Sequence, residues 1–388
     1  MSNDTQPEIS FPGFTEDWEE RKLGDVTAEV FQGINTAGDK VEYSDTGTPI
    51  LQAKHITGGD VTFDEARFLD KERYSNYFPK YVPVENDILF ANIGTIGPST
   101  VVRDESEFLV AWNILKITLK KPEIAEFIQL QLDQLNQKHY FDSVLTGNAT
   151  KFVNKDEMLR TPISVPTIEE QKKVGAFFSN IQRAITLHQR KLDLLKETKK
   201  GFLQKMFPKN GAKVPEIRFP GFTEDWELCK LKEIVDVRSG RDYKHLGSGN
   251  IPVYGTGGYM LSVSEALSYD EDAIGIGRKG TINNPYILKA PFWTVDTLFY
   301  AIPKNNFDLN FIYSIFRKIN WKSKDESTGV PSLSKTTINA VTVYIPSGSE
   351  QQRIGEFFKQ IDNTITLHQR KLDLLKETKK GFLQKMFV

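Results

Sequence analysis

The sequence predicts a mixed α/β (α+β) fold in which two mixed domains alternate with two long helices. These helices pair as an antiparallel coiled coil, and the two halves form a pseudo-twofold internal repeat. Three observations predict this fold: two segments occur twice, one of them has the apolar period of a coiled coil, and the regions between them carry short apolar runs bounded by Gly, Pro and Asn. The 388 residues exceed what one ordinary core holds.

The repeats set the order of the chain. Residues 185–207, ITLHQRKLDLLKETKKGFLQKMF, recur unchanged at 365–387. Residues 7–19, PEISFPGFTEDWE, return at 215–227 with one difference. The middles, roughly 25–150 and 233–330, have almost nothing in common. Two copies are too few for a stacked solenoid, which needs about three or more, so the pattern favours two variable domains on one common frame.

Five segments follow from this order. They are a first mixed domain at 1–166, a first helix at 167–207, a linker at 208–214, a second mixed domain at 215–346 and a second helix at 347–388. Short helical stretches are expected near 122–140 and 307–320. The polar residues 1–12 have neither a basic end nor an apolar core, so we do not expect a secretory signal there.

Each long helix is predicted to begin with a capping box and to carry one apolar stripe. Thr167 with Glu170, and Ser347 with Glu350, fit the S/T-x-x-E pattern. The stripe repeats every 3.5 residues, which is typical of a coiled coil. Its expected contact residues are Ile181, Ile185, Leu192, Leu195 and Phe202 in the first copy, and Ile361, Ile365, Leu372, Leu375 and Phe382 in the second. Each helix could instead pack only on its own domain, but two near-identical stripes favour packing of the helices on each other.

Charge is distributed unevenly along the chain. The formal net charge is -1, which is not the basic total of a simple nucleic-acid binder. Residues 1–166 carry 16 Lys and Arg against 27 Asp and Glu, a net of -11, whereas residues 167–214 carry 11 against 4, a net of +7. Any phosphate contact must therefore come from local patches, from the helices or from a partner protein.

The composition points to a reducing, cytoplasmic protein without its own chemistry. The single cysteine, Cys229, excludes an internal disulfide, and one Cys with five His argues against a zinc site. No apolar run approaches the ~20 residues that cross a bilayer. Gly275–Gly280 matches G-x-G-x-x-G, but the following Asn283-Asn284-Pro285 breaks the helix that a dinucleotide site needs. No Walker A, H-E-x-x-H or G-x-S-x-G motif occurs, so no catalytic residue is expected.

Candidate nucleic-acid contacts lie in polar and basic stretches of the middles. A glycine loop recurs after an apolar strand, as Gly277–Ile282 in the second half and Ala91–Ile96 in the first. Basic side chains can reach phosphate or guanine, and amides can read adenine. The candidates are Gln32, Asn35, Lys54, His55, Asn92, Thr95 and Lys151 in the first half, and Arg238, Arg241, Lys244, His245, Arg278, Lys279, Lys322, Lys324 and Lys335 in the second. Plain turns with solvated charges are the alternative.

These residues together give the chain a family resemblance. The segment PEIRFPGFTEDWE, the loop Gly329–Lys335, the IP/VP-x-x-x-EQ helix starts at Pro166–Gln171 and Pro346–Gln351, and the paired ITLHQRKLDLLKETKKGFLQKMF helices resemble the specificity subunits of type I restriction–modification enzymes. The resemblance covers nearly the whole chain, and it rests on the duplicated order more than on any one motif.

The resemblance implies a non-catalytic, DNA-reading subunit. Its mixed domains would be target-recognition domains, each reading one half of a bipartite, asymmetric site in double-stranded DNA. Its helices would set the unread spacer and dock two methyltransferase (M) subunits. S-adenosylmethionine would be bound by those subunits, which methylate adenine, and ATP and Mg²⁺ by motor–nuclease (R) subunits, so this chain would bind no cofactor itself. A helix of roughly 35–40 residues spans ~50–60 Å, more than the ~34 Å of one DNA turn.

Two other functions remain open at this stage. A coiled-coil scaffold could join two protein-binding domains, and salt-sensitive DNA binding would separate that hypothesis from DNA recognition. The hypothesis of a nucleotide-binding enzyme rests only on the loop Gly275–Gly280, and titration with a dinucleotide would test it.

Overall fold

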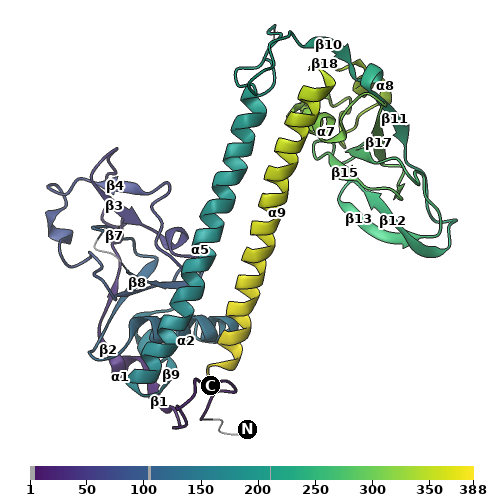
Figure 1. Cartoon of the computed structure of the whole chain (residues 1–388). Helices are drawn as coiled ribbons and strands as arrows, with labels where there is room; N and C mark the ends of the chain where they lie inside the picture. Colours follow the sequence, from purple (N-terminus) through teal and green to yellow (C-terminus); the bar gives the residue numbers. More distant parts are fainter. Residues whose placement is uncertain (1–4, 104–105, 210) are drawn as a thin grey trace. The chain divides into compact units, whose positions relative to one another are not determined.

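The computed structural model describes residues 5–103, 106–209 and 211–388 (Figure 1). Contacts divide the chain into two compact units, which we describe separately. Unit 1 comprises Met1–Gln189 with Arg370–Val388, and unit 2 comprises Arg190–Gln369. Asn210 of the predicted linker lies outside the described residues. The helices within the described ranges include none that is long and apolar enough to span a membrane.

Unit 1 contains a four-stranded sheet, a three-stranded sheet and a separate strand pair. The four-stranded sheet has the order β2 (Thr27–Gln32), β8 (Ile114–Leu119), β5 (Ile88–Ala91) and β6 (Ser99–Val101). In the other sheet β3 (Thr48–Leu51) is antiparallel to β4 (Arg67–Leu69) and parallel to β7 (Leu109–Val110). Strand β1 (Glu19–Lys22) pairs with β9 (Pro162–Val165). The short helices are α1 (Leu23–Val26), η1 (Ala53–His55), η2 (Ser75–Tyr77), α2 (Ala125–Gln137), α3 (Tyr140–Ser143) and α4 (Lys155–Arg160).

Unit 2 repeats this topology with different residues. Its four-stranded sheet has the order β11 (Val235–Ser239), β17 (Leu298–Pro303), β14 (Ala273–Gly277) and β15 (Tyr286–Leu288). Strand β12 (Ser248–Gly255) is antiparallel to β13 (Gly258–Val263) and parallel to β16 (Trp293–Thr294), and β10 (Glu227–Lys230) pairs with β18 (Thr342–Ile345). The short helices are α6 (Leu231–Ile234), α7 (Leu309–Lys318), η3 (Trp321–Lys324) and α8 (Lys335–Ala340). The two middles therefore share one fold although their sequences differ.

Glycines at matching positions show how closely the two sheets correspond. The amide of Gly33, after β2, donates to the carbonyl of Ile114 at 3.0 Å, and the amide of Gly240, after β11, donates to that of Leu298 at 3.0 Å. A Cβ atom on Gly33 would lie 2.2 Å from the carbonyl oxygen of Ala111, and one on Gly240 would lie 2.0 Å from that of Val295. Any side chain at either position would therefore clash with backbone, so both sheets need glycine there.

The long helices are α5 (Ile168–Lys205) and α9 (Gly348–Lys385), and they lie antiparallel. In unit 1 Phe177 meets Phe382, with ring centroids 5.1 Å apart, and Gln182 meets Lys379 at 3.1 Å. In unit 2 Lys199 meets Asp362 at 2.5 Å, and Phe202 meets Phe357 at 5.1 Å. Within each unit, residues further along α5 contact residues earlier in α9, as in an antiparallel pair. The prediction of a mixed fold with two antiparallel long helices is therefore confirmed.

The predicted stripe residues of these helices are buried or half-buried. Ile185, Leu192 and Leu372 are buried, and the other predicted contact residues, Ile181, Leu195, Phe202, Ile361, Ile365, Leu375 and Phe382, are half-buried. Lys199 interrupts the stripe yet is only 8% exposed. Burial lowers the pKa of Lys199, and its ion pair with Asp362 opposes that shift. The buried charge thus depends on its partner across the helix pair.

The residues that directly follow each long helix enter an aromatic core. In unit 1 the Phe387 ring stacks on Phe127, with centroids 5.4 Å apart, and meets Trp18 edge-on at 5.7 Å. In unit 2 the Phe207 ring stacks on Phe311 at 5.7 Å and meets Trp226 edge-on at 5.9 Å. Each core is therefore completed by the helix that follows the other mixed domain in the sequence. The predicted division of the chain into five consecutive segments stays a prediction.

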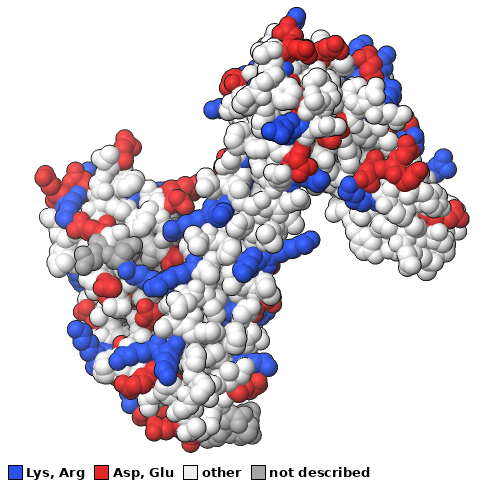
Figure 2. Space-filling model, viewed as in Figure 1, with Lys and Arg blue, Asp and Glu red and all other residues white. Residues whose placement is uncertain are grey.

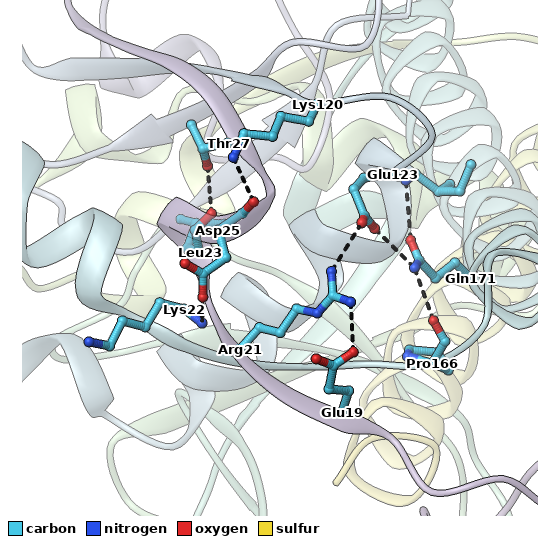
Figure 3. A network of polar contacts seen from close by, with 11 residues as sticks. Glu19, Arg21, Lys22, Leu23, Asp25, Thr27, Lys120, Glu123, Pro166 and Gln171 are labelled. Atoms are coloured by element: carbon cyan, nitrogen blue, oxygen red, sulfur yellow. Dashed lines mark hydrogen bonds and ion pairs between the residues drawn. The ribbon is translucent and has the colours of Figure 1, made fainter.

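Polar contacts tie the start of α5 to the first mixed domain (Figure 3). The Nε2 of Gln171 donates to the Glu123 carboxylate at 3.0 Å and to the Pro166 carbonyl at 3.1 Å. Arg21 of β1 lies on the other side of Glu123, at 3.7 Å, and also binds Glu19 at 2.6 Å. Gln171 is fully buried, so the Gln of the E-Q motif holds the helix in place.

The start of α9 is held by a similar glutamine and by an arginine. Gln351 donates to the Pro346 carbonyl at 3.0 Å and accepts from the Asp308 amide at 3.3 Å. Glu350 was predicted to cap its own helix, but both of its carboxylate oxygens bind Arg218 at 2.7 Å. Position 218 is the one difference between the short repeats, where the first copy has Ser10. The guanidinium outcompetes the backbone amide because it pairs with a carboxylate that is 1% exposed.

Candidate nucleic-acid interface

The recurring glycine loop occupies the same place in both units. It follows β5 in unit 1 and β14 in unit 2, and Gly94 and Gly280 both have positive φ angles, of 79° and 89°. The carbonyl of Asn92 accepts from the Val153 amide at 3.0 Å, and that of Arg278 accepts from the Leu333 amide at 3.0 Å. Asn92 and Arg278 are thus equivalent positions of one scaffold, with Lys155 and Lys335 two residues beyond the matching amides.

In unit 2 this loop borders a basic concavity of about 410 Å³. Its lining residues are Ser239, Phe299, the loop residues Arg278 and Lys279, and Ser332–Lys335. The Arg278 guanidinium lies 5.8 Å from the centre of the Phe299 ring, and its Nη1 donates to the Asp296 carbonyl at 3.4 Å. Among the residues that the structure describes, no carboxylate lies within 4.0 Å of Arg278, Lys279 or Lys335. The concavity can therefore hold an anion.

In unit 1 the equivalent place holds a pair of amides. Asn92 Nδ2 donates to Gln32 Oε1 at 3.1 Å, and Gln32 Nε2 donates to Asn92 Oδ1 at 3.2 Å. Asn92 also donates to the Val153 carbonyl at 3.0 Å and is 0% exposed, while Gln32 donates to the Trp112 carbonyl. In this conformation the two amides satisfy each other, so reading a base with Asn92 would first require opening the pair.

The other first-half candidates divide between the loop and other places. Thr95, in the loop, and Lys151, next to it, are both exposed, and Ile93 of the loop bridges to Phe152. Asn35 is exposed and accepts from the Gly38 amide at 3.0 Å, which closes a local turn.

Lys54 and His55 lie on η1, and their contacts do not lead to the loop. Lys54 binds Glu65 at 3.1 Å. His55 is 3% exposed, and its Nδ1 accepts from the Gln52 amide at 2.8 Å. Burial lowers the pKa of His55, so the ring is neutral at pH 7. In this conformation its ring does not reach solvent.

The remaining second-half candidates are not gathered at the concavity; Arg238 is half-buried and the others are exposed. Arg238 binds Asp236 at 2.7 Å and Glu271 at 3.0 Å, which neutralises its charge. Arg241, Lys244 and His245 lie on the loop after β11, where the His245 ring is 6.0 Å from Trp293. Lys322 and Lys324 lie on η3, with exposed side chains. The structure therefore brings together Arg278, Lys279 and Lys335 out of nine candidates.

Sequence reasoning missed several exposed or charged residues at this interface and on the helices. Trp112, next to the amide pair, is 44% exposed. Phe31 is surrounded by three lysines, which form a second basic cluster. Four leucines of the long helices point outward, Leu187 and Leu374 in unit 1 and Leu194 and Leu367 in unit 2, at 64–67% exposure. Phe31 and Lys116 are paired across neighbouring strands. No local sequence pattern links them to Lys80 and Lys155.

The charge on the drawn face follows the composition. Figure 2 shows Lys and Arg side chains projecting from the long helices, and acidic and basic side chains interspersed over each mixed domain. The predicted helix segments carry net charges of +7 (with the linker) and +3.

Comparison with known proteins identifies the family. The family model of the type I restriction modification DNA specificity domain matches residues 15–197 and again residues 223–377. The chain belongs to this family. The two matches cover most of both mixed domains and of both long helices, so each half of the chain carries one copy of the domain.

Named relatives and one solved structure agree with this assignment. The type I restriction enzyme MjaVIII specificity subunit of Methanocaldococcus jannaschii is 23% identical over 80% of this chain and 85% of its own length. A second protein of that organism, provisionally named the MjaX specificity subunit, is 23% identical over 95% of this chain and 92% of its own. The crystal structure of a type I restriction–modification S subunit from M. genitalium shares the fold, with a TM-score of 0.73, 16% identity and coverage of 99% of both chains. Specificity subunits are non-catalytic, and the cofactors of these systems belong to their partner subunits.

The concavity makes Arg278 the sharpest test of base reading by this specificity subunit. We expect Arg278→Ala to weaken DNA binding by about ten-fold or more only when the half-site of the second domain is intact, because an arginine–guanine contact contributes ~1–3 kcal/mol of discrimination. Binding of the assembled enzyme would be measured on duplexes with either half-site scrambled. Arg317→Ala is the matched control, since Arg317 binds Asn284 at 3.3 Å. An equal loss on all duplexes would contradict base reading and mark Arg278 as a phosphate contact.

Proposed function

We propose that this specificity subunit reads a bipartite, asymmetric DNA site, one half with each mixed domain. The observation that carries this proposal is the shared topology of the two domains with different side chains at equivalent positions: Gln32 and Asn92 in the first half, Ser239 and Arg278 in the second. Two domains with the same backbone fold but different loop side chains could each recognise a different DNA sequence. The target-recognition domains would be residues 1–166 and 215–346, and the candidate contacts named above would supply their chemistry.

The long helices serve, in this proposal, as spacer and as docking surface for two methyltransferase subunits. Motor–nuclease subunits would join the same assembly, in the cytoplasm, with S-adenosylmethionine, ATP and Mg²⁺ bound by these partners. The exposed leucines support docking, because each unit presents one outward leucine from each helix on an otherwise charged surface. Such apolar positions do not stabilise the free helix pair, since they are solvated.

Leucine substitution tests the docking role. We expect Leu187→Glu combined with Leu374→Glu to reduce the co-purified methyltransferase from two copies to one, because two charges would replace apolar contacts of ~1.5–3 kcal/mol each in unit 1 alone. The melting temperature should stay unchanged because both side chains are exposed. Leu228→Glu, at a position 60% exposed on β10, is the control. A double variant that still binds two copies would place the methyltransferase elsewhere.

Methylation mapping tests the function itself. Single-molecule sequencing of DNA from cells that express the chain with its cognate methyltransferase should show one methylated motif, with two specific halves and an unread gap. Such a gap is expected because each mixed domain would read its own half-site. No motif, in cells where the methyltransferase is shown to be active, would contradict the proposal and favour the scaffold function.

A further inference from the structure

Three lysines surround one phenylalanine at the edge of the four-stranded sheet in unit 1. The ammonium groups of Lys80, Lys116 and Lys155 lie 5.3, 5.3 and 5.7 Å from the centre of the Phe31 ring. Phe31 lies on the edge strand β2, and Lys116 is its register partner on β8. Three cations over one ring face or edge form a compact positive cluster, since ring contact partly offsets their repulsion.

The cluster has little negative charge to balance it. Lys116 lies 3.8 Å from Asp87, a carboxylate that is 1% exposed and also accepts from the Thr118 hydroxyl at 2.5 Å and the Val84 amide at 2.9 Å. Lys80 and Lys155 are exposed, and neither has a carboxylate within 4.0 Å among the described residues. The cluster thus keeps an excess of positive charge within a domain whose net charge is -11.

The cluster adjoins the candidate interface. Gln32, which follows Phe31 on β2, binds the loop residue Asn92. Lys155 begins α4 at the position equivalent to Lys335, which lines the basic concavity of unit 2. An anion bound by the cluster would therefore lie beside the residues that we propose to read DNA.

No equivalent cluster occurs among the described residues of unit 2. The positions equivalent to Phe31 and Lys116 are Arg238 and Tyr300, which pair across β11 and β17 in the same register. In unit 2 the cation is on the first strand of the pair and the aromatic ring on the second, the reverse of unit 1. Arg238 also forms ion pairs with Asp236 and Glu271. The two halves thus place positive charge differently: unit 2 in the loop at Arg278 and Lys279, unit 1 at the sheet edge.

We propose that Phe31 with Lys80, Lys116 and Lys155 is a phosphate-binding site for the backbone of duplex DNA. This inference rests on the proposed function. Lys80 and Lys155 donate to phosphate oxygens, and the Phe31 ring and the Lys116–Asp87 pair hold the cluster in place. The site supplies the first domain with the local positive charge that its composition lacks.

Salt dependence of DNA binding tests this site in the assembled enzyme. The variant is Lys80→Gln with Lys155→Gln, which leaves the buried Lys116–Asp87 pair intact. Each lost phosphate contact should reduce the slope of log K against log salt by about 0.9, so we expect a reduction of about 1.8, the same for target and scrambled duplexes. Lys80→Arg with Lys155→Arg keeps the charge and should restore most of the slope.

The control is Lys71→Gln with Arg73→Gln, two exposed basic residues of the same domain that pair with Glu107 and Glu42. Its slope should equal that of the wild type, and an unchanged slope in the Lys80/Lys155 variant would overturn the inference. Calorimetric titration with inorganic phosphate separates the sources: a phosphate heat lost in the variant, with an unchanged DNA slope, would assign the site to free phosphate and also overturn it. Failure of the proposed function would show differently, as a wild-type assembly without target preference.

Discussion

The aromatic cluster at the end of each long helix is the interaction on which the rest of the structure depends. Phe387 packs among Trp18, Phe127 and Phe178 in unit 1, and Phe207 packs among Trp226, Phe311 and Phe358 in unit 2. Each ring contributes a large buried apolar area and specific edge-on and stacked contacts. The cluster joins the N-terminal repeat, a mixed-domain helix and both long helices into one core. The helices therefore stay antiparallel, and the loops that carry charge and amides keep their places on each sheet.

This dependence explains which parts of the sequence repeat. The segments that supply Trp18, Trp226, Phe207 and Phe387 are nearly identical in both halves, because they build the same cluster twice. The middles are free to change, since their sheets need only buried apolar strands, a glycine after β2 or β11, and a backbone-bonded loop. The short repeats differ at one position, where the first has Ser10 and the second has Arg218. Arg218 forms a buried ion pair with Glu350, and among the described residues this pair occurs only in unit 2. Burial raises the pKa of its counterpart Glu170, which has no arginine partner there.

The frame could be predicted from the sequence, whereas most of the interface could not. Repeats and apolar periodicity predicted two long antiparallel helices, which the structure has at Ile168–Lys205 and Gly348–Lys385. The glycine loop could be found because it recurs after an apolar strand in both halves, and its glycines Gly94 and Gly280 have positive φ angles. The identical topology of the middles left no sequence signal, since different residues fill the same strands. Burial of Asn92 and His55, neutralisation of Arg238 by Glu271, and the gathering of Phe31 with Lys80 and Lys155 all depend on residues distant in the sequence, so only the folded chain shows them.

The central claim is that two interchangeable readers sit on one repeated frame. The most direct measurement replaces residues 231–341 by residues 23–161, because Leu23 and Leu231 begin equivalent helices and bond to Thr161 and Val341 at 2.8 and 2.9 Å. Methylated adenines would then be mapped in cells expressing this chain with its methyltransferase, after assembly and helicity are verified. The account predicts a new motif with the first half-site on both sides of the gap, in inverted orientation. An assembled, active enzyme that still marks the original asymmetric motif would contradict it.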